Sequence, residues 1–450
     1  MKRKIYSRLQ QWKNQWHGKA ALMIDGARRV GKSWIAEEFA RNEYKSFIMI
    51  DFNNPQDGVV ELFELYLSDL DTFFNRLSIY TNTPLYERES VIVFDEVQMY
   101  PKARAAIKYL VKDGRYDYIE TGSLVSINHN VRDIVIPSEE IRLDMHPMDL
   151  EEFAWALGEE KLWDFVVTQF KSRQPMGQAL HRKAMELLRT YMIVGGMPQA
   201  VDAWVRSHDF GMVDGVKRNI LSLYRNDISK YAYRQASNVT RVFDNIPGAL
   251  HQHEKRFRPT QVKKGARMNS FTEAFFWLDE SRVANFCYAA TEPNIALALS
   301  RNDSKVKIYM ADTGLLLSMA FDVDMLTASG IYQKILRDKL EFNKGMLTEN
   351  LVAQMLKASN HPLYFFSTYS REDSTDCMEI DFLIRKPSVT SRHNICPIEV
   401  KSSANYKLSS LNKFSTKYGE YVGDKYVIHS ADLRVEGDFI YLPLYMAPLL

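Results

Sequence analysis

Long apolar runs are missing from this sequence of 450 residues, and none approaches the about 18 residues that a membrane-spanning helix needs. The N-terminal stretch MKRKIYSRLQQWKNQW is basic but lacks the apolar core of a signal peptide. Cysteine is scarce, since the chain holds only Cys287, Cys377 and Cys396. Three scattered cysteines are too few for a disulfide framework or a zinc site and indicate a reducing compartment. We therefore expect a cytoplasmic protein without membrane contact.

A strong charge of either sign is absent as well, because the formal net charge at pH 7 is only +2. This excludes a global field that draws a protein to nucleic acid, so that any such binding must use a local basic patch. With 46% hydrophobic and 25% charged residues, the composition is that of a globular protein. The length predicts about three domains.

The first motif present is a phosphate-binding loop with the spacing G-x-x-x-x-G-K-[ST]. An apolar run at 20–24 precedes it as a buried strand, and 34–41 continues it as a helix. The glycines let backbone N–H groups turn toward phosphate oxygens, and the helix N-terminus adds a positive dipole. The lysine reaches the terminal phosphates and the serine is a ligand for Mg²⁺, which predicts an ATP site. The loop consists of Gly26, Ala27, Arg28, Arg29, Val30, Gly31, Lys32 and Ser33.

A second nucleotide motif follows after one strand–helix unit, in which 46–51 is an expected strand and 59–77 has apolar residues at helical spacing. The apolar strand 91–96 ends in Asp95 and Glu96, 63 residues after Lys32. We expect Asp95 to hold Mg²⁺ through water and Glu96 to polarise the attacking water. Acidic residues at a strand end are also common surface caps, and the upstream loop favours the nucleotide interpretation.

A further strand at 117–120 leads into Thr121-Gly122-Ser123. ATPases of the AAA type place a polar sensor of the γ-phosphate at this point, and either Thr121 or Ser123 fits that role. A turn that merely uses glycine and serine is the alternative. A last strand within 139–150 precedes a helix that starts at 151, where we expect the ATPase core to end.

The order G-A-R-R-V-G-K-S, V-F-D-E-V-Q, T-G-S and M-D-L-E-E-F resembles the prokaryotic AAA-like ATPases whose C-terminal half bears a domain of unknown function. The segments 191–198 (YMIVGGMP), 225–228 (RNDI) and 309–316 (YMADTGLL) extend this resemblance over nearly the whole chain. It implies an α/β P-loop core at 1–150 and a helical lid at 151–235. In such a lid, Arg218 or Arg225 reaches the γ-phosphate of a neighbouring subunit in a homo-oligomer. Solvated helix-face arginines are the alternative.

The middle of the chain combines a basic segment with the order of a winged helix. Residues 255–267 (KRFRPTQVKKGAR) hold six basic residues and no acid, and they precede an amphipathic helix at 271–278 that Asn269 or Ser270 caps. Strands at 282–288 and 305–310 follow as a hairpin, with 289–304 as the wing. We predict a winged-helix-like module at 236–325. It contacts DNA phosphates or serves only as packing for the ATPase.

The last part, 326–450, carries acidic residues in a characteristic order. Glu349 lies on the apolar face of an expected helix, where a carboxylate is costly. Asp381 belongs to the strand 380–384, and in 397–401 alternation places Glu399 and Lys401 on one face. This order resembles the PD-(D/E)xK fold of restriction-endonuclease-like nucleases and Holliday junction resolvases. The resemblance implies that Asp381 and Glu399 bind Mg²⁺ and that Lys401 orients the water, with Glu349 as a fourth catalytic residue.

Two functions remain open at this stage. The first is an ATPase that controls a DNA-directed nuclease. The second is a nucleotide-switched interaction or signalling protein whose nuclease-like domain binds a partner and cleaves nothing, with Asp381 and Glu399 in a salt bridge to Lys401.

Overall fold

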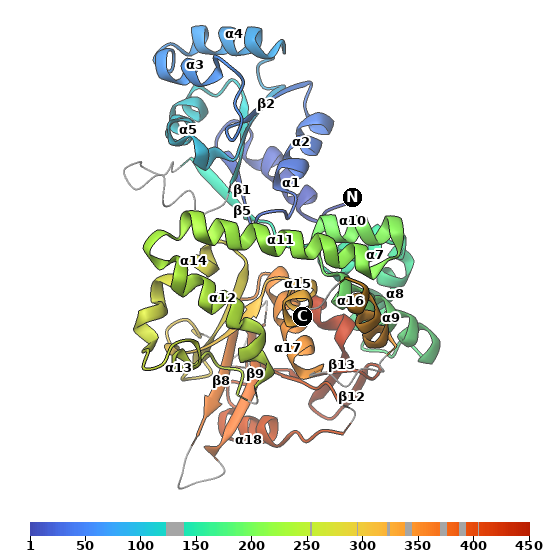
Figure 1. Ribbon diagram of the computed structural model, residues 1–450. Helices are drawn as coiled ribbons and strands as arrows, with labels where there is room; N and C mark the ends of the chain where they lie inside the picture. The colour runs from blue at the N-terminus through green and yellow to red at the C-terminus, as the bar shows by residue number, and fades with distance from the viewer. Residues whose placement is uncertain are drawn as a thin grey trace. The chain divides into compact units, whose positions relative to one another are not determined.

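The structure is a computed structural model in which residues 1–122, 139–252, 254–294, 296–321, 325–337, 344–369, 376–386, 393–403 and 405–450 are described. The chain divides into two compact units, each with its own sheet (Figure 1). The first unit holds residues 1–146 and 280–282, and the second holds 147–279 and 283–450. No helix in the described ranges is both long and apolar enough to cross a bilayer.

The first unit is built on a five-stranded parallel sheet in the order β2-β3-β4-β1-β5. Its strands are β1 Ala21–Asp25, β2 Ser46–Asp51, β3 Ser90–Asp95, β4 Asp117–Gly122 and β5 Glu140–Asp144. The helices of this unit are α1 Ile5–Trp16, α2 Lys32–Glu43, α3 Val59–Leu65, α4 Leu70–Thr81 and α5 Pro101–Asp113. The central strands are apolar runs because both faces of a parallel sheet are covered. The expected α/β fold with a parallel sheet is confirmed for this unit.

The register of this sheet brings the motifs to one edge. Asp51 pairs with Asp95, and Asp25 pairs with both Gly122 and Asp144, so that β1, β3 and β4 all end at the same side. The carboxyl edge of an open parallel sheet is the usual place for ligands. The phosphate-binding loop, which follows β1, therefore opens at the functional edge.

The segment 59–77, which carries apolar residues at helical spacing, is helical in two pieces, α3 and α4, with a break between them. The break is fixed locally: the side chain of Asp69 accepts a hydrogen bond from the Thr72 backbone N–H at 3.2 Å and so caps α4. The apolar spacing in the sequence does not reveal the break, because α3 and α4 each bury an apolar face in the same hydrophobic cluster.

The second unit begins with helices and ends with a mixed sheet. Its helices are α7 Leu150–Ala156, α8 Glu160–Ser172, α9 Gln178–Val194, α10 Pro198–Ser207, α11 Phe210–Tyr231, α12 Ala236–His251, α13 Pro259–Val262, α14 Thr272–Glu280, α15 Thr313–Ala320, α16 Met325–Leu336, α17 Lys344–Ala358 and α18 Ser409–Tyr418. Its strands are β6 Ala284–Ala290, β7 Arg301–Met310, β8 Tyr364–Thr368, β9 Met378–Arg385, β10 Ile395–Val400, β11 Lys425–His429, β12 Arg434–Glu436 and β13 Phe439–Pro443. The last residue of α14 falls within 280–282, which cluster with the first unit.

These eight strands form one sheet in the order β12-β13-β11-β10-β9-β8-β6-β7. The hairpin β6–β7, which we expected inside a winged-helix-like module at 236–325, is therefore part of the C-terminal sheet. The physical reason is edge pairing: β6 is nearly all buried and adds to β8 in parallel, from Tyr288 opposite Tyr364 to Ala290 opposite Phe366. The bounds of the four domains predicted from the sequence stay predictions.

Two of the segments that carried the family resemblance meet inside the second unit. The backbone N–H of Gly196 donates to the buried carboxylate of Asp312 at 2.5 Å, and the same carboxylate caps α15 by accepting from Leu315 at 2.9 Å. Gly195 has φ +82°, and a Cβ there would lie 2.3 Å from an Asp312 oxygen. A Cβ on Gly196 would instead lie 2.0 Å from the Met148 carbonyl oxygen, so both glycines are needed, each because of a different close neighbour.

Candidate nucleotide site and carboxylate cluster

The phosphate-binding loop runs from the end of β1 into α2, whose N-cap is Gly31 in the left-handed region at φ 97°. Arg29 is also left-handed at φ 72°, and Arg28 and Arg29 are exposed. Gly26 cannot carry a side chain, since a Cβ there would lie 2.3 Å from the Met145 carbonyl oxygen. The loop thus combines the close backbone approach and helix N-terminus that phosphate binding requires.

Lys32 lies inside this loop and is only 6% exposed. Its ammonium donates to the carbonyl oxygens of Gly26 at 2.9 Å and Ala27 at 3.0 Å. Burial lowers the pKa of Lys32, and the nearby Glu96, Asp25 and Asp95 oppose that shift. An ammonium that donates to neutral carbonyl oxygens can exchange them for the oxygens of an anion, to which charge-assisted hydrogen bonds are stronger.

Asp95 and Thr121 are joined at the ends of the neighbouring strands β3 and β4. The Thr121 hydroxyl donates to an Asp95 carboxylate oxygen and accepts from the backbone N–H of Glu96 at 3.2 Å. Burial raises the pKa of Asp95, while hydrogen bonds from Thr121 and Ser33 lower it. Thr121, the first of the two sensor candidates, therefore orients the acidic motif directly. Ser123, the second candidate, lies outside the described residues.

Glu96 occupies a special backbone position at φ 51°, which is uncommon for a residue other than glycine. Its carboxylate accepts a hydrogen bond from the Gln98 side chain at 2.5 Å. Strained positions of this kind gather at functional sites because the surrounding fold holds them. The buried Gln98, which the sequence analysis missed, fixes the orientation of the proposed base.

Arg3 is a second missed residue of this site. It is 6% exposed, and it donates to the carbonyl oxygens of Val30 in the phosphate-binding loop at 2.8 Å and of His146 after β5 at 2.7 Å. The basic N-terminal stretch contained the signal, but charge alone did not distinguish a buried arginine from a solvated one.

Ser33 and Asp95 suit a magnesium ion, since they offer a hydroxyl and a carboxylate oxygen that lie within hydrogen-bond reach of each other. Hard oxygen ligands are the ones that Mg²⁺ prefers. The residues at this edge of the sheet therefore fit the Mg²⁺·ATP that the motif implies.

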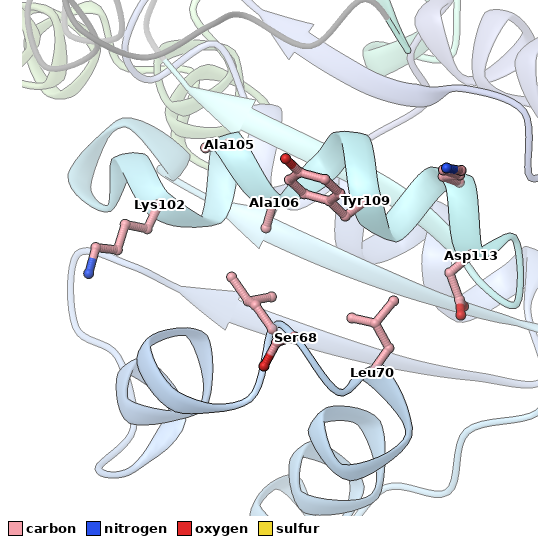
Figure 2. Close-up of a pocket in the computed structure, with 9 residues that line it drawn as sticks. Ser68, Leu70, Lys102, Ala105, Ala106, Tyr109 and Asp113 are labelled. Carbon is pink, nitrogen blue, oxygen red and sulfur yellow. The ribbon is translucent and has the colours of Figure 1, made fainter.

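A separate groove of about 750 Å³ lies in the first unit between the α3–α4 connection and α5 (Figure 2). Leu67 and Leu70 line one side, and Ala106 and the 63% exposed Tyr109 line the other. None of the predicted nucleotide-site residues lines it. Nothing in the described parts of the chain shows what covers this groove.

In the second unit, the four predicted residues of the nuclease-like site do come together. Glu349 on α17 is 3% exposed, Asp381 lies on β9, and Glu399 on β10 is 7% exposed. Asp381 accepts a hydrogen bond from the Val400 backbone N–H at 2.8 Å, and Lys401 donates to Glu399 at 2.6 Å. We call Glu349, Glu379, Asp381 and Glu399 the carboxylate cluster.

The centre of this cluster is Lys307, which the sequence analysis missed. Its ammonium lies 3.1 Å from Glu349, 2.9 Å from Glu379 and 3.8 Å from Asp381. The side chain is 1% exposed. Within strand 305–310 the residue alternates with apolar Val306 and Ile308, so a lysine on a buried face was detectable only once the sheet partners were known.

Two cations of the basic segment enter the same cluster. Lys255 forms an ion pair with Glu349, and Arg256 lies 3.8 Å from Glu379 and donates to the Ser367 hydroxyl at 2.9 Å. The segment also pairs with β7, where the Phe257 N–H donates to the Val306 carbonyl at 2.8 Å. Part of the segment predicted to contact DNA is thus used inside the unit.

Burial and neighbouring charges shift the pKa values of the acid groups in the cluster in opposite directions. Burial raises the pKa of Glu349, but Lys307 and Lys255 outweigh burial and bring the pKa to about 2. Burial, assisted by Glu349, raises the pKa of Asp381 to about 7. Burial also raises the pKa of Glu399, against the effect of Lys401.

The magnesium ion implied by the nuclease resemblance does not fit these residues. Each carboxylate of the cluster faces a cation of the same unit. Among the described residues, no group of three or more His, Cys, Asp or Glu side chains is arranged to hold a metal ion. A cluster already compensated by ammonium and guanidinium groups has no need of an added cation.

The two arginines considered as contacts to a neighbouring subunit are both engaged within the chain. Arg218 lies 2.6 Å from Asp214 and donates to the Phe321 carbonyl at 2.7 Å. Arg225 lies 2.9 Å from Asp244.

Three family models match the sequence. The model described as an AAA domain matches residues 18–154. Two models described as domains of unknown function, DUF8612 and DUF4143, match residues 185–326 and 344–446. A comparison with curated proteins finds no match.

Solved structures resemble the chain only distantly. A Walker-type ATPase of Pyrococcus abyssi is 15% identical with a TM-score of 0.42, and the match covers 71% of this chain and 96% of that protein. The STAND protein with a tetratricopeptide repeat sensor from Pyrococcus horikoshii is 10% identical with a TM-score of 0.28, covering 78% and 45%. The ORC1 protein of Aeropyrum pernix in complex with DNA is 10% identical with a TM-score of 0.28, covering 75% and 93%.

These structural likenesses are too weak to transfer a function. The AAA match, however, spans the parallel sheet and the phosphate-binding loop. Residues 18–154 are therefore similar to an AAA domain and form an ATPase-like core with a P-loop on a parallel sheet.

Proposed function

We propose that the protein is a cytoplasmic, Mg²⁺-dependent ATPase that acts as a nucleotide-operated switch, and that its nuclease-like C-terminal part binds a partner without cleaving it. The observation that carries the ATPase part is the meeting of Lys32, Asp95 and Thr121 at one edge of the sheet. The absence of cleavage is supported by the carboxylate cluster, whose negative charges are paired with lysine and arginine side chains.

Each residue at that edge has a separate task. Lys32 exchanges the carbonyl oxygens of its own loop for phosphate oxygens, which are better acceptors for a buried ammonium. Ser33 and Asp95 would hold Mg²⁺, which when bound neutralises charge that develops on the phosphates. Thr121 keeps Asp95 in position, and Glu96 accepts a proton from the attacking water.

The test is a comparison of two variants in binding and turnover. We expect Lys32→Ala to lose ATP binding in a calorimetric titration, because it removes the phosphate contact. We expect Glu96→Gln to bind ATP as wild type does and to hydrolyse it about 100-fold more slowly or worse, because only the base is lost. Normal turnover in Glu96→Gln would refute the assignment of Glu96.

A second candidate activity, DNA contact, is favoured by the part of the basic segment that remains on the surface. Lys263, Lys264 and Arg267 are exposed, and none of the ion pairs among the described residues uses them. Exposed cations without an acidic partner suit phosphate groups. Self-assembly with a second copy is a further part of the proposal, and the mass of the protein in solution with and without ATP tests it.

A further inference from the structure

We propose that Lys307 is a built-in counter-ion that takes the place of a divalent cation in the carboxylate cluster, and that removing its charge turns the cluster into a metal site. This proposal shares one premise with the proposed function, namely that the C-terminal part does not cleave DNA. It concerns metal binding, which can be measured apart from any reaction.

The carboxylates around Lys307 are arranged as they are around a bound metal ion, which is coordinated by side chains from separate helices and strands. One ammonium lies within 4 Å of three carboxylates, at 3.1 Å from Glu349 on α17, 2.9 Å from Glu379 and 3.8 Å from Asp381 on β9. Three carboxylates gathered around one point would otherwise repel one another. Lys307 therefore supplies positive charge that a divalent cation would supply in a metal site.

Lys307 is also fixed so that it does not leave when a cation is added. Its backbone pairs with Cys287 on β6 on one side and bridges to Arg256 on the other. Its ammonium lies 5.0 Å from the ring centre of Phe365, and the side chain is 1% exposed. A cation from solution would have to displace a covalently attached charge that is already buried and paired.

The cluster nevertheless retains the oxygen ligands that a hard cation needs. Glu399 Oε2 is buried and accepts no hydrogen bond from the described residues, while its other oxygen accepts from Lys401. Asp381 uses one oxygen to accept the Val400 N–H and keeps the other toward Lys307. Without the Lys307 ammonium, Asp381 and Glu399 Oε2 offer oxygens of the kind that bind Mg²⁺ or Mn²⁺, while Lys255 stays paired with Glu349 and Lys401 with the other Glu399 oxygen.

The experiment is a titration of the nucleotide-free full chain with Mn²⁺, with free Mn²⁺ followed by electron paramagnetic resonance. We expect Lys307→Met to gain one bound Mn²⁺ equivalent at least about tenfold tighter than any binding by wild type, because one repelling charge is removed. The matched control is Lys305→Met, a half-buried lysine on the same strand, which should bind as wild type does. Adding Asp381→Asn to Lys307→Met should remove the gained equivalent.

Two results would overturn the proposal. One is a folded Lys307→Met protein, judged by its circular dichroism, that binds no more Mn²⁺ than wild type. The other needs no variant of Lys307: Mn²⁺ binding by the wild-type chain that Asp381→Asn abolishes would show a metal site already open. Because ATP turnover is not measured, failure here leaves the assignment of Lys32 and Glu96 untouched, and failure of that assignment leaves this one untouched.

Discussion

Arg3 connects the first residues of the chain to the nucleotide site. Its guanidinium is buried and holds the carbonyl oxygens of Val30 in the phosphate-binding loop and of His146 beyond β5. Hydrogen bonds from a charged donor contribute about 1.5–3 kcal/mol each when the partner group is buried. Arg3 therefore helps to position the phosphate-binding loop through the Val30 carbonyl.

We predict that Arg3→Met weakens ATP binding and lowers the free energy of unfolding by about 2 kcal/mol, since two buried carbonyl groups lose a charged donor. Arg8→Met on the exposed side of α1 is the control and should change neither quantity. Calorimetric ATP titration and urea unfolding give the two measurements. Unchanged ATP affinity in Arg3→Met would show that Arg3 does not position the loop.

A buried charge triad behind the nucleotide edge leads to a pH prediction. Arg104 lies 2.8 Å from a carboxylate oxygen of Glu120 and 2.8 Å from one of Glu140, and all three side chains are buried. Burial raises the pKa of Glu120 to about 8, because Arg104 only partly offsets it and Glu140 adds to it. Glu120 therefore keeps a proton in the folded state that the unfolded chain releases near pH 4.5.

Since the folded state binds more protons between these two pKa values, stability should fall as pH rises from about 4.5 to about 8. The upper limit of the slope is about 1.4 kcal/mol per pH unit. Glu120→Gln should flatten this decline in urea unfolding at pH 5.5 and pH 8, whereas Glu61→Gln, at an exposed position on α3, should not. An equal decline in Glu120→Gln and wild type would contradict the raised pKa.

At the scale of helices and strands, apolar patterning predicted most elements of the first unit. The strand 46–51 appears with the same bounds as β2, and the strand expected at 91–96 is β3, Ser90–Asp95. Patterning failed where the partner of an element mattered. The hairpin β6–β7 was expected to stand alone, and only its pairing with β8 shows that it extends the C-terminal sheet.

The same limit explains which site residues were missed. Glycine and lysine at fixed spacing identified the phosphate-binding loop, because the residues that bind phosphate and the glycines that shape the backbone lie in one short stretch of sequence. Lys307 carries no such local signal, since its partners Glu349 and Glu379 come from α17 and β9. A cluster assembled by long-range pairing becomes visible only when the strand order is known.

The basic segment gives a prediction at the element scale. Replacing Lys263, Lys264 and Arg267 by alanine should weaken DNA binding and reduce the dependence of log affinity on log salt by about three units, roughly 0.9 for each lost phosphate contact. Three exposed lysines elsewhere, Lys108, Lys161 and Lys171, form the matched control triple. Binding is measured by fluorescence anisotropy. If the slope of log affinity against log salt concentration is unchanged, the segment has a structural role and does not contact DNA.

At the scale of the whole molecule, the two units differ in how their charges are arranged. In the first, Lys32 contacts neutral carbonyl oxygens and an acidic residue stands beside a hydroxyl, so that an anion and a cation can both be accepted. In the second, Glu349 and its neighbours are already paired with lysines. We therefore expect ATP hydrolysis in the first unit and no phosphodiester cleavage in the second.

The most direct test incubates one wild-type preparation with ATP and a mixture of linear, branched and single-stranded DNA, first in Mg²⁺ and then in Mn²⁺, and measures both products. We expect phosphate release that is lost in Lys32→Ala and DNA that stays intact with either metal. Absence of ATP hydrolysis, or DNA cleavage that disappears in Asp381→Asn, would contradict this expectation.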